Sequence, residues 1–129
     1  MNTSLSLLIT SFFTAYLPNV AGYSENTIKS YRDTFVLLFS FSGEQKLCPR
    51  GRINIDIVSR ENITGFLEWL ENSRNASVST RNQRLAALKS FSRYVSLNTI
   101  EYLDIFQQIL DIRPKKDISK TVDYTPVLY

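Results

Sequence analysis

Residues 77–97 read SVSTRNQRLAALKSFSRYVSL, and the spacing of the apolar side chains in this stretch predicts a long helix with one buried face. Successive residues of an α-helix lie about 100° apart around the helix axis. With that spacing the apolar side chains share one face, which carries Leu85, Leu88, Phe91, Tyr94 and Val95. Ser77 or Ser79 can cap the first turn, because a serine hydroxyl accepts a hydrogen bond from a free backbone N–H. We therefore expect a helix from this pair of serines to about Leu97.

The opposite face of the same helix is polar and basic. The charged residues between Ser77 and Asn98 are all positive, namely Arg81, Arg84, Lys89 and Arg93, in a chain whose total charge is +3. This face carries Ser79, Asn82, Gln83, Ala86, Lys89, Ser90 and Arg93. Asn and Gln can pair with adenine in the major groove, Ser can contact a base or a phosphate, and Lys or Arg neutralise phosphates. The pattern is typical of a DNA-reading helix, and a solvated face with uneven charge is the alternative.

Two segments before this helix show the same apolar periodicity. Residues 5–17 place apolar side chains at positions 5, 8, 9, 12, 13 and 16, which predicts a helix with one buried face. Pro18 and Gly22 resist continuation, so we expect this helix to end within residues 18–22. Ser24 can then cap a second helix, whose core face carries Ile28, Tyr31, Phe35, Leu38 and Phe39. Its opposite face repeats the polar design more weakly, with Asn26, Lys29, Ser30 and Asp33.

The rest of the chain predicts two shorter helices and three irregular stretches. Residues 43–56 contain Pro49 and Gly51 and predict a loop. At its end Ile53, Ile55 and Ile57 alternate and can form a short extended piece. Ser59 can cap a third helix, whose apolar residues are Ile63, Phe66, Leu67 and Leu70, with Trp69 alongside. Residues 72–76 form a polar connector, and a fifth helix over residues 102–110 stops before Pro114. Residues 114–129 have no periodicity and predict a linker or tail.

Composition limits the chemistry that the chain can perform. The 129 residues suffice for one domain, and 43% apolar residues with only four glycines and four prolines favour an all-α fold. The absence of histidine excludes Ser-His-Asp and Cys-His catalysis and imidazole metal sites. The lone Cys48 allows neither an intrachain disulfide nor a cysteine zinc site, and it indicates a reducing compartment. We therefore expect no catalytic residue, no metal, no cofactor and no small-molecule substrate.

No segment predicts a signal peptide or a membrane span. The apolar stretch near the N-terminus is interrupted by Thr10, Ser11 and Thr14, and no Lys or Arg precedes Lys29. A signal peptide needs a basic region before its apolar core, and a bilayer-spanning helix needs about 20 apolar residues. The sequence therefore predicts a cytoplasmic protein that has no membrane partner.

Three segments together resemble the core-binding domain of tyrosine recombinases, the family that includes phage integrases, Xer-type recombinases and transposon integrases. Residues 23–31, YSENTIKSY, are similar to the family's opening motif G-(L/Y)-S-x-N-T-I-x-S-Y. Residues 79–91, STRNQRLAALKSF, are similar to its second motif, T-x-N-x-R-L-x-A-L-(R/K)-x-F. Between them, residues 57–67 resemble the element i-t-x-x-d-I-x-x-F-l. The three motifs agree in order and spacing, and the resemblance covers about residues 5–110.

The resemblance implies a SAM-like orthogonal bundle of four to five helices that forms one half of a C-shaped clamp around duplex DNA. In the family the second and fourth helices lie in the major groove. Together with the polar faces described above, this gives an expected set of DNA contacts: Asn26, Thr27, Lys29, Ser30, Ser79, Thr80, Arg81, Asn82, Gln83, Arg84, Lys89 and Arg93. Thr27 and Thr80 have an alternative role as helix-start residues that bond backbone groups. Arg84 projects near the apolar edge and can cross the core surface before it reaches a phosphate.

We expect no catalysis from this chain. The family's reaction needs a C-terminal domain with a nucleophilic Tyr, two Arg, a Lys and His-type acid/base residues. Tyr124 and Tyr129 lie in the tail without Arg-rich surroundings, so neither is expected to be a nucleophile. The sequence thus predicts a core-binding domain over residues 1–112 and an interdomain linker or tail over residues 113–129, with the catalytic domain absent.

Two other functional classes are alternatives. A helical protein-interaction module would oligomerise without DNA, and the apolar residues Ile100, Tyr102, Leu103, Ile105, Phe106 and Ile109 suit either a partner or packing on the bundle. A helix-turn-helix regulator is disfavoured, because the third and fourth helices are not joined by the required tight turn. The expected partners are therefore double-stranded DNA and other recombinase protomers, the latter through helices one and five.

Overall fold

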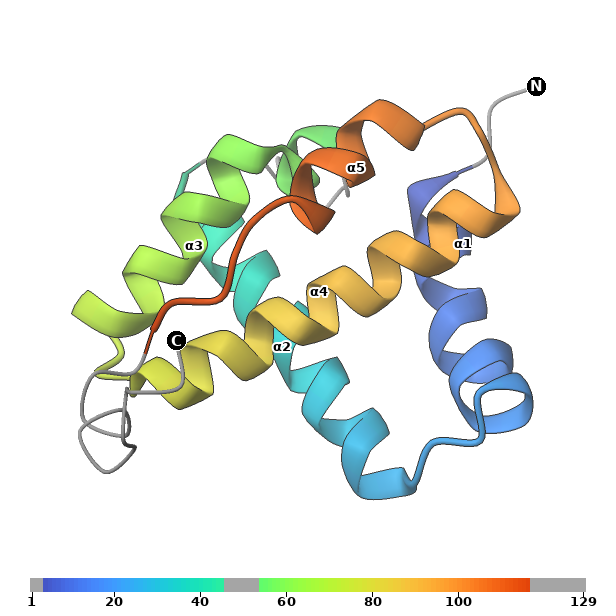
Figure 1. Cartoon of the computed structure of the whole chain (residues 1–129), viewed down its shortest axis with the longest axis horizontal. Helices are drawn as coiled ribbons and strands as arrows, with labels where there is room; N and C mark the ends of the chain where they lie inside the picture. Colours follow the sequence, from blue (N-terminus) through green and yellow to red (C-terminus); the bar gives the residue numbers. More distant parts are fainter. Residues whose placement is uncertain (1–3, 46–53, 117–129) are drawn as a thin grey trace, which may run out of the picture.

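The computed structural model describes residues 4–45 and 54–116, and all regular elements of these residues are helical (Figure 1). Helix α1 (Leu5–Ser11) continues directly into a π-helix, η1 (Phe12–Val20), which is followed by α2 (Glu25–Glu44). A short 3-10 helix, η3 (Ile55–Val58), precedes α3 (Arg60–Asn72), α4 (Val78–Asn98) and α5 (Leu103–Leu110). No strand occurs in the described residues, so the expected all-α fold is confirmed.

Three serines begin the three long helices. Ser24, Ser59 and Ser77 have extended backbones, and each hydroxyl accepts a hydrogen bond from the backbone N–H three residues later, at 3.1–3.2 Å. The choice between Ser77 and Ser79 is thereby settled for Ser77. A cap of this kind satisfies one of the N–H groups that the first turn leaves free, and it contributes about 1 kcal/mol.

The first helix ends at Val20, within the expected residues 18–22, but Pro18 itself lies inside the helix. The π-helix η1 carries the chain through Pro18 as far as Val20, and the N–H of Ala21 donates to the carbonyl of Tyr16, five residues back, at 2.8 Å. Proline is excluded from α-helix interiors because it lacks the N–H and its ring clashes with the carbonyl four residues earlier. In a π-helix the hydrogen bonds join residues five apart, so the wider turn avoids the close approach between the proline ring and that carbonyl. It also moves the next buried side chain to Leu17, five residues after Phe12.

The stretch before α3 is helical rather than extended, so the prediction for the alternating isoleucines is wrong for Ile55 and Ile57. Both belong to η3, whose first turn is capped by Asn54 Oδ1, which accepts the N–H of Asp56 at 2.9 Å. Adjacent side chains point to opposite faces of a strand, whereas here Ile57 and its neighbour Val58 are both buried. Ile53, Pro49 and Gly51 of the predicted loop lie outside the described residues.

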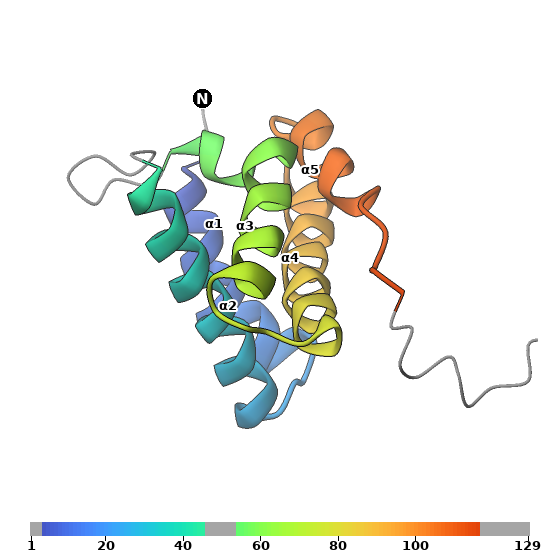
Figure 2. The same cartoon turned by 90° about the vertical axis from the view of Figure 1, so that its left-hand side faces the viewer.

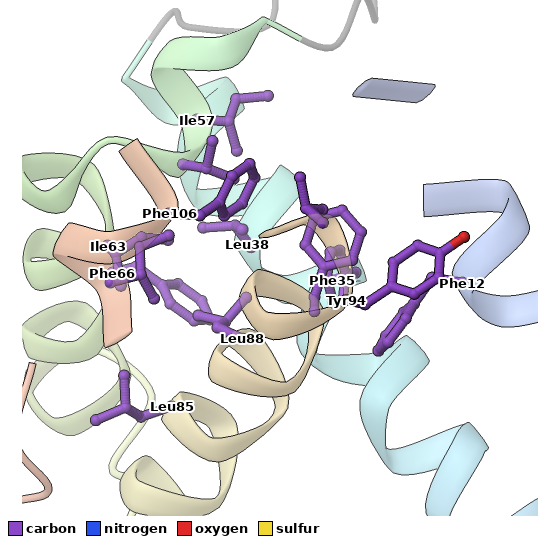
Figure 3. Close-up of a cluster of buried hydrophobic side chains, with 14 of the residues drawn as sticks. Phe12, Phe35, Leu38, Ile57, Ile63, Phe66, Leu85, Leu88, Tyr94 and Phe106 are labelled. Carbon is purple, nitrogen blue, oxygen red and sulfur yellow. The ribbon is translucent and has the colours of Figure 1, made fainter. Parts of the chain in front are cut away.

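Helix α4 packs against α2, α3 and α5, and in Figure 1 it crosses α2 and runs below α3 and α5. The ring of Phe91, on α4, meets Phe12 of η1, Phe35 of α2 and Phe106 of α5, with ring centroids 5.2, 5.2 and 5.6 Å apart. Figure 3 shows Phe12, Phe35 and Phe106 gathered in one buried cluster with Leu38 and Leu88. The predicted core faces are largely confirmed, although Tyr31 and Phe39 are only half-buried at its margin.

No helix within residues 4–45 and 54–116 combines the length and the apolarity that crossing a bilayer requires.

A buried amide connects α3 to its neighbours and gives a first test of the fold. Asn62 Nδ2 donates to Ser42 Oγ of α2 at 3.0 Å and to the carbonyl of Ile57 at 2.8 Å.

Asn62→Ala removes this donor from both acceptors and is expected to lower the free energy of unfolding by about 1–3 kcal/mol. Urea denaturation measures the change, with Glu68→Ala, exposed on the same helix, as control. An equal loss of unfolding free energy in both variants would contradict a stabilising role for the two hydrogen bonds of Asn62.

Candidate nucleic-acid interface

Helices α2 and α4 begin with the same local structure. Each starts with a Ser-x-x-Thr sequence, Ser24 to Thr27 and Ser77 to Thr80, and in each the threonine N–H donates to the serine Oγ. The serine hydroxyl in turn donates to the threonine Oγ1, at 3.1 Å in both helices. The half-buried threonines therefore take part in the caps, the alternative role that their position suggested.

The amino-terminal ends of α2 and α4 both lie in the lower half of the bundle in Figure 2, and in Figure 1 that of α2 is at the bottom and that of α4 is at the left. Each end presents free backbone N–H groups and the positive end of a helix dipole, which attract anions. The exposed carboxylate of Glu25 offsets this attraction in the first turn of α2, whereas the first turn of α4 has no acidic residue.

Arg84 joins the two helices near the place where they cross. Its Nη1 donates to the carbonyl of Ser30 at 3.0 Å and to Oγ1 of Thr34 at 3.2 Å, and both acceptors belong to α2. Its Nε is buried and has no hydrogen-bond partner within the described residues. The side chain crosses the surface of the core, as its place at the apolar edge predicts, and it ends on α2.

Five residues of the expected DNA-contacting set have exposed side chains. Three lie in the first turns of α2 and two lie on α4: Asn26, Lys29, Ser30, Gln83 and Arg93. Ser79 is half-buried on the first turn of α4. Amides, hydroxyls and cations are the groups that contact base edges and phosphates, so this part of the surface has the chemistry that duplex DNA requires.

Two other residues of that set bond within the chain. Arg81 Nε lies 3.3 Å from Glu71 Oε1, and the side-chain amide of Asn82 forms two hydrogen bonds with the backbone of Lys115. The sequence did not reveal Glu71 and Lys115 as the partners of these two residues. Lys115 in particular is 33 residues from Asn82, in a stretch without periodicity.

The aromatic side chain of Tyr31 brings the second half of α4 close to α2. Ser90 and Arg93, in the second half of α4, lie near enough to its hydroxyl to act on it electrostatically. Burial raises the pKa of Tyr31 above its ordinary value, and the neighbouring Tyr23 raises it further. Arg93 therefore lies beside α2, although it is nine residues beyond Arg84.

An open groove of about 440 Å³ lies between η1 and the first turns of α2. Its lining combines apolar side chains with two cations and one carboxylate: Phe13, Pro18, Ile28, Asn26, Lys29, Arg32 and Glu25. Arg32 is an exposed cation that sequence reasoning missed. Its spacing of three residues from Lys29 was the available signal, because residues three apart share a helix face.

Residues 8–101 match the family described as phage integrase, N-terminal SAM-like domain. The chain belongs to this family. Two Sinorhizobium fredii proteins named as integrase/recombinases, y4rC and y4rD, are 37% identical over 121 residues and 30% identical over 112 residues. The alignments cover 94% and 87% of this chain but 36% and 40% of the relatives, so the chain spans less than half of either. No solved structure matches the chain.

The family match includes all three motifs that carry the recombinase resemblance, so the resemblance and the SAM-like fold are both confirmed. Among the described residues of this integrase domain, no group of three or more His, Cys, Asp or Glu side chains is placed to hold a metal ion.

Lys89 of the SAM-like domain is half-buried between two charged neighbours. Burial lowers its pKa below the ordinary value of 10.5, repulsion from Arg93 lowers it further, and Asp111 opposes the shift. The folded state thus binds this proton more weakly than the unfolded state, so the contribution of Lys89 to stability rises with pH in the window just below 10.5.

We expect Arg93→Gln to move the pKa of Lys89 back toward 10.5, because it removes a like charge, and Asp111→Asn to move it further down. An NMR titration of the Lys89 side chain measures both shifts. Shifts of the same sign in the two variants would contradict the placement of Lys89 between these groups.

Proposed function

We propose that this domain binds duplex DNA as the core-binding half of a site-specific tyrosine recombinase, with α2 and α4 in the major groove. The observation that carries the proposal is the link from Arg84 to Ser30 and Thr34, which ties together two identically capped helices. Two rigidly joined helix ends can enter one groove region together, whereas two independent helices would lose orientational freedom on binding. Membership of the integrase family and the names of the relatives support the same function.

The proposal divides the expected contacts into two groups. The exposed or half-exposed polar residues, Asn26, Ser30, Ser79 and Gln83, read base edges, and Lys29, Lys89 and Arg93 bind phosphates. The others support the surface through bonds within the chain: Thr27, Thr80, Arg81, Asn82 and Arg84.

We assign DNA cleavage and rejoining to the portion of the longer relatives that this chain does not span. Residues 1–112 act as the DNA-binding domain in this proposal, and residues 113–129 lead from it as a linker. No residue of the chain is given a catalytic role, in keeping with the absence of histidine.

Two substitutions separate phosphate contacts from base contacts. Lys29→Gln is expected to weaken binding to all duplexes about equally and to reduce the slope of log affinity against log salt by about 1. Gln83→Ala is expected to lose about 1–3 kcal/mol of discrimination at one base pair. Mobility-shift titrations at several salt concentrations measure both effects, on a site selected from a randomised duplex library and on a scrambled duplex.

Arg60→Gln is the matched control for these titrations. It changes the net charge by the same amount as Lys29→Gln, but Arg60 lies on α3 and donates to the carbonyl of Gln108 of α5. Its effect on binding should therefore be small. Absence of salt-dependent binding to every duplex would reject the proposed function, and equal effects of Lys29→Gln and Arg60→Gln would reject the assigned surface.

Contacts with other protomers form the second part of the proposal. The apolar residues around α5 are divided, since Phe106 and Ile109 are fully buried whereas Leu97, Ile100 and Leu103 are 81%, 86% and 42% exposed. Leu7 of α1 is also exposed. Exposed apolar side chains that follow one another along the surface suit a protein partner.

We expect Ile100→Glu to reduce assembly of the domain on DNA, because it places a charge at an apolar contact, and to leave the affinity of a single copy unchanged. Sedimentation velocity with and without duplex DNA measures the assembly, and Thr64→Glu, which adds the same charge at an exposed residue of α3, is the control. Assembly that is independent of DNA would instead support a protein-interaction module.

A further inference from the structure

The chain that follows α5 is held on the surface of α4 and does not leave the bundle at once. Ile112 is buried, and the segment then runs along α4 toward the amino-terminal end of that helix (Figure 1). It thereby brings Lys115 next to Asn82, at the end of α4 that carries Ser79 and Gln83.

The side-chain amide of Asn82 binds the backbone of Lys115 at two points. Its Nδ2 donates to the carbonyl of Lys115 at 2.7 Å, and its Oδ1 accepts the N–H of Lys115 at 2.9 Å. Arg81 Nη1 donates to the same Oδ1 at 2.9 Å. The orientation of the amide is therefore determined, because a flipped amide would place its N–H groups against two donors. The recognition uses only the peptide backbone of Lys115.

An ionic contact reinforces the same place. Glu71 of α3 bridges two cations, with Oε1 3.3 Å from Arg81 Nε and Oε2 2.9 Å from Lys115 Nζ. The side chains of Glu71 and Arg81 are 21% and 14% exposed, whereas that of Lys115 is 53% exposed. Glu71 and Arg81 thus form an ion pair on the surface of the bundle, and the more exposed Lys115 binds to the second carboxylate oxygen of Glu71.

We propose that Asn82, Arg81 and Glu71 form a docking site that fastens the chain at Lys115 and fixes where it leaves the DNA-binding domain. In this arrangement Asn82 is a positioning residue: its amide is occupied by the chain itself, and its neighbour Gln83 is the residue that reads DNA. Anything that follows residue 116 starts from a fixed point beside the end of α4. The consequence for DNA rests on the proposed function, while the docking itself does not.

Hydrogen exchange at the Lys115 amide tests the docking in the whole chain without DNA. Asn82→Ala removes both backbone bonds and keeps a strong helix former in α4, so exchange at Lys115 should rise about tenfold. Lys115→Ala removes only an exposed ion pair, and exchange at residue 115 should rise about two- to fivefold. Lys116→Ala and Gln83→Ala, at exposed neighbouring positions, should leave it unchanged. Equal exchange in Asn82→Ala and the native chain would overturn the proposal.

Duplex binding by the same two α4 variants separates this inference from the proposed function. Asn82→Ala should change affinity and base preference less than threefold, whereas Gln83→Ala should alter the preference at one base pair. If Asn82→Ala altered base preference as Gln83→Ala does, Asn82 would be a DNA contact and its positioning role would be rejected. If Asn82→Ala accelerates exchange at Lys115 while no variant binds DNA, the docking holds and the proposed function fails.

Discussion

The packing of Phe91 against three other rings is the interaction on which the arrangement of helices depends. One side chain of α4 meets η1, α2 and α5 at the same time, and truncation of a fully buried phenylalanine typically costs about 3–5 kcal/mol. Because α4 is packed against three helices, few of its residues remain exposed, and apart from Asn98 at its end they lie on one narrow strip: Gln83, Ala86, Arg93 and Leu97. The core thus decides which residues of the most basic helix are available to a ligand.

Arg84 connects this core to the candidate interface. It bonds a carbonyl and a hydroxyl of α2 rather than a carboxylate, so its positive charge is not neutralised by these partners. Burying part of a cation costs free energy, and the two charge-assisted hydrogen bonds offset that cost. The same side chain therefore holds α2 against α4 and keeps a positive charge next to Ser30, one of the residues of the expected DNA-contacting set.

Local chemistry is what the sequence predicts well. Ser24, Ser59 and the serine pair before α4 are recognisable as caps because a cap depends on the few residues that follow it. The path through Pro18 is not predictable in this way, since the π turn depends on the packing of Phe12 and Leu17 on other helices. The family motifs mark the faces of α2 and α4, but they do not reveal that Arg84 ends on Ser30 or that Asn82 is taken by Lys115. These partners are 54 and 33 residues away in the chain.

Asn82 and Gln83 illustrate how one rigid helix can serve two purposes. They are adjacent in sequence and lie about 100° apart on α4, so one side chain meets the segment after α5 while the other is directed to solvent. A helix held by its core on three sides cannot rotate to exchange these roles. In the proposed function, DNA bound to Gln83 and the chain bound to Asn82 therefore have a fixed position relative to each other, because both are held by the same turn of α4. The sequence alone places both amides in one expected set of DNA contacts. The burial of Leu85 and Phe91 fixes the rotation of α4, so that the two amides face different surroundings.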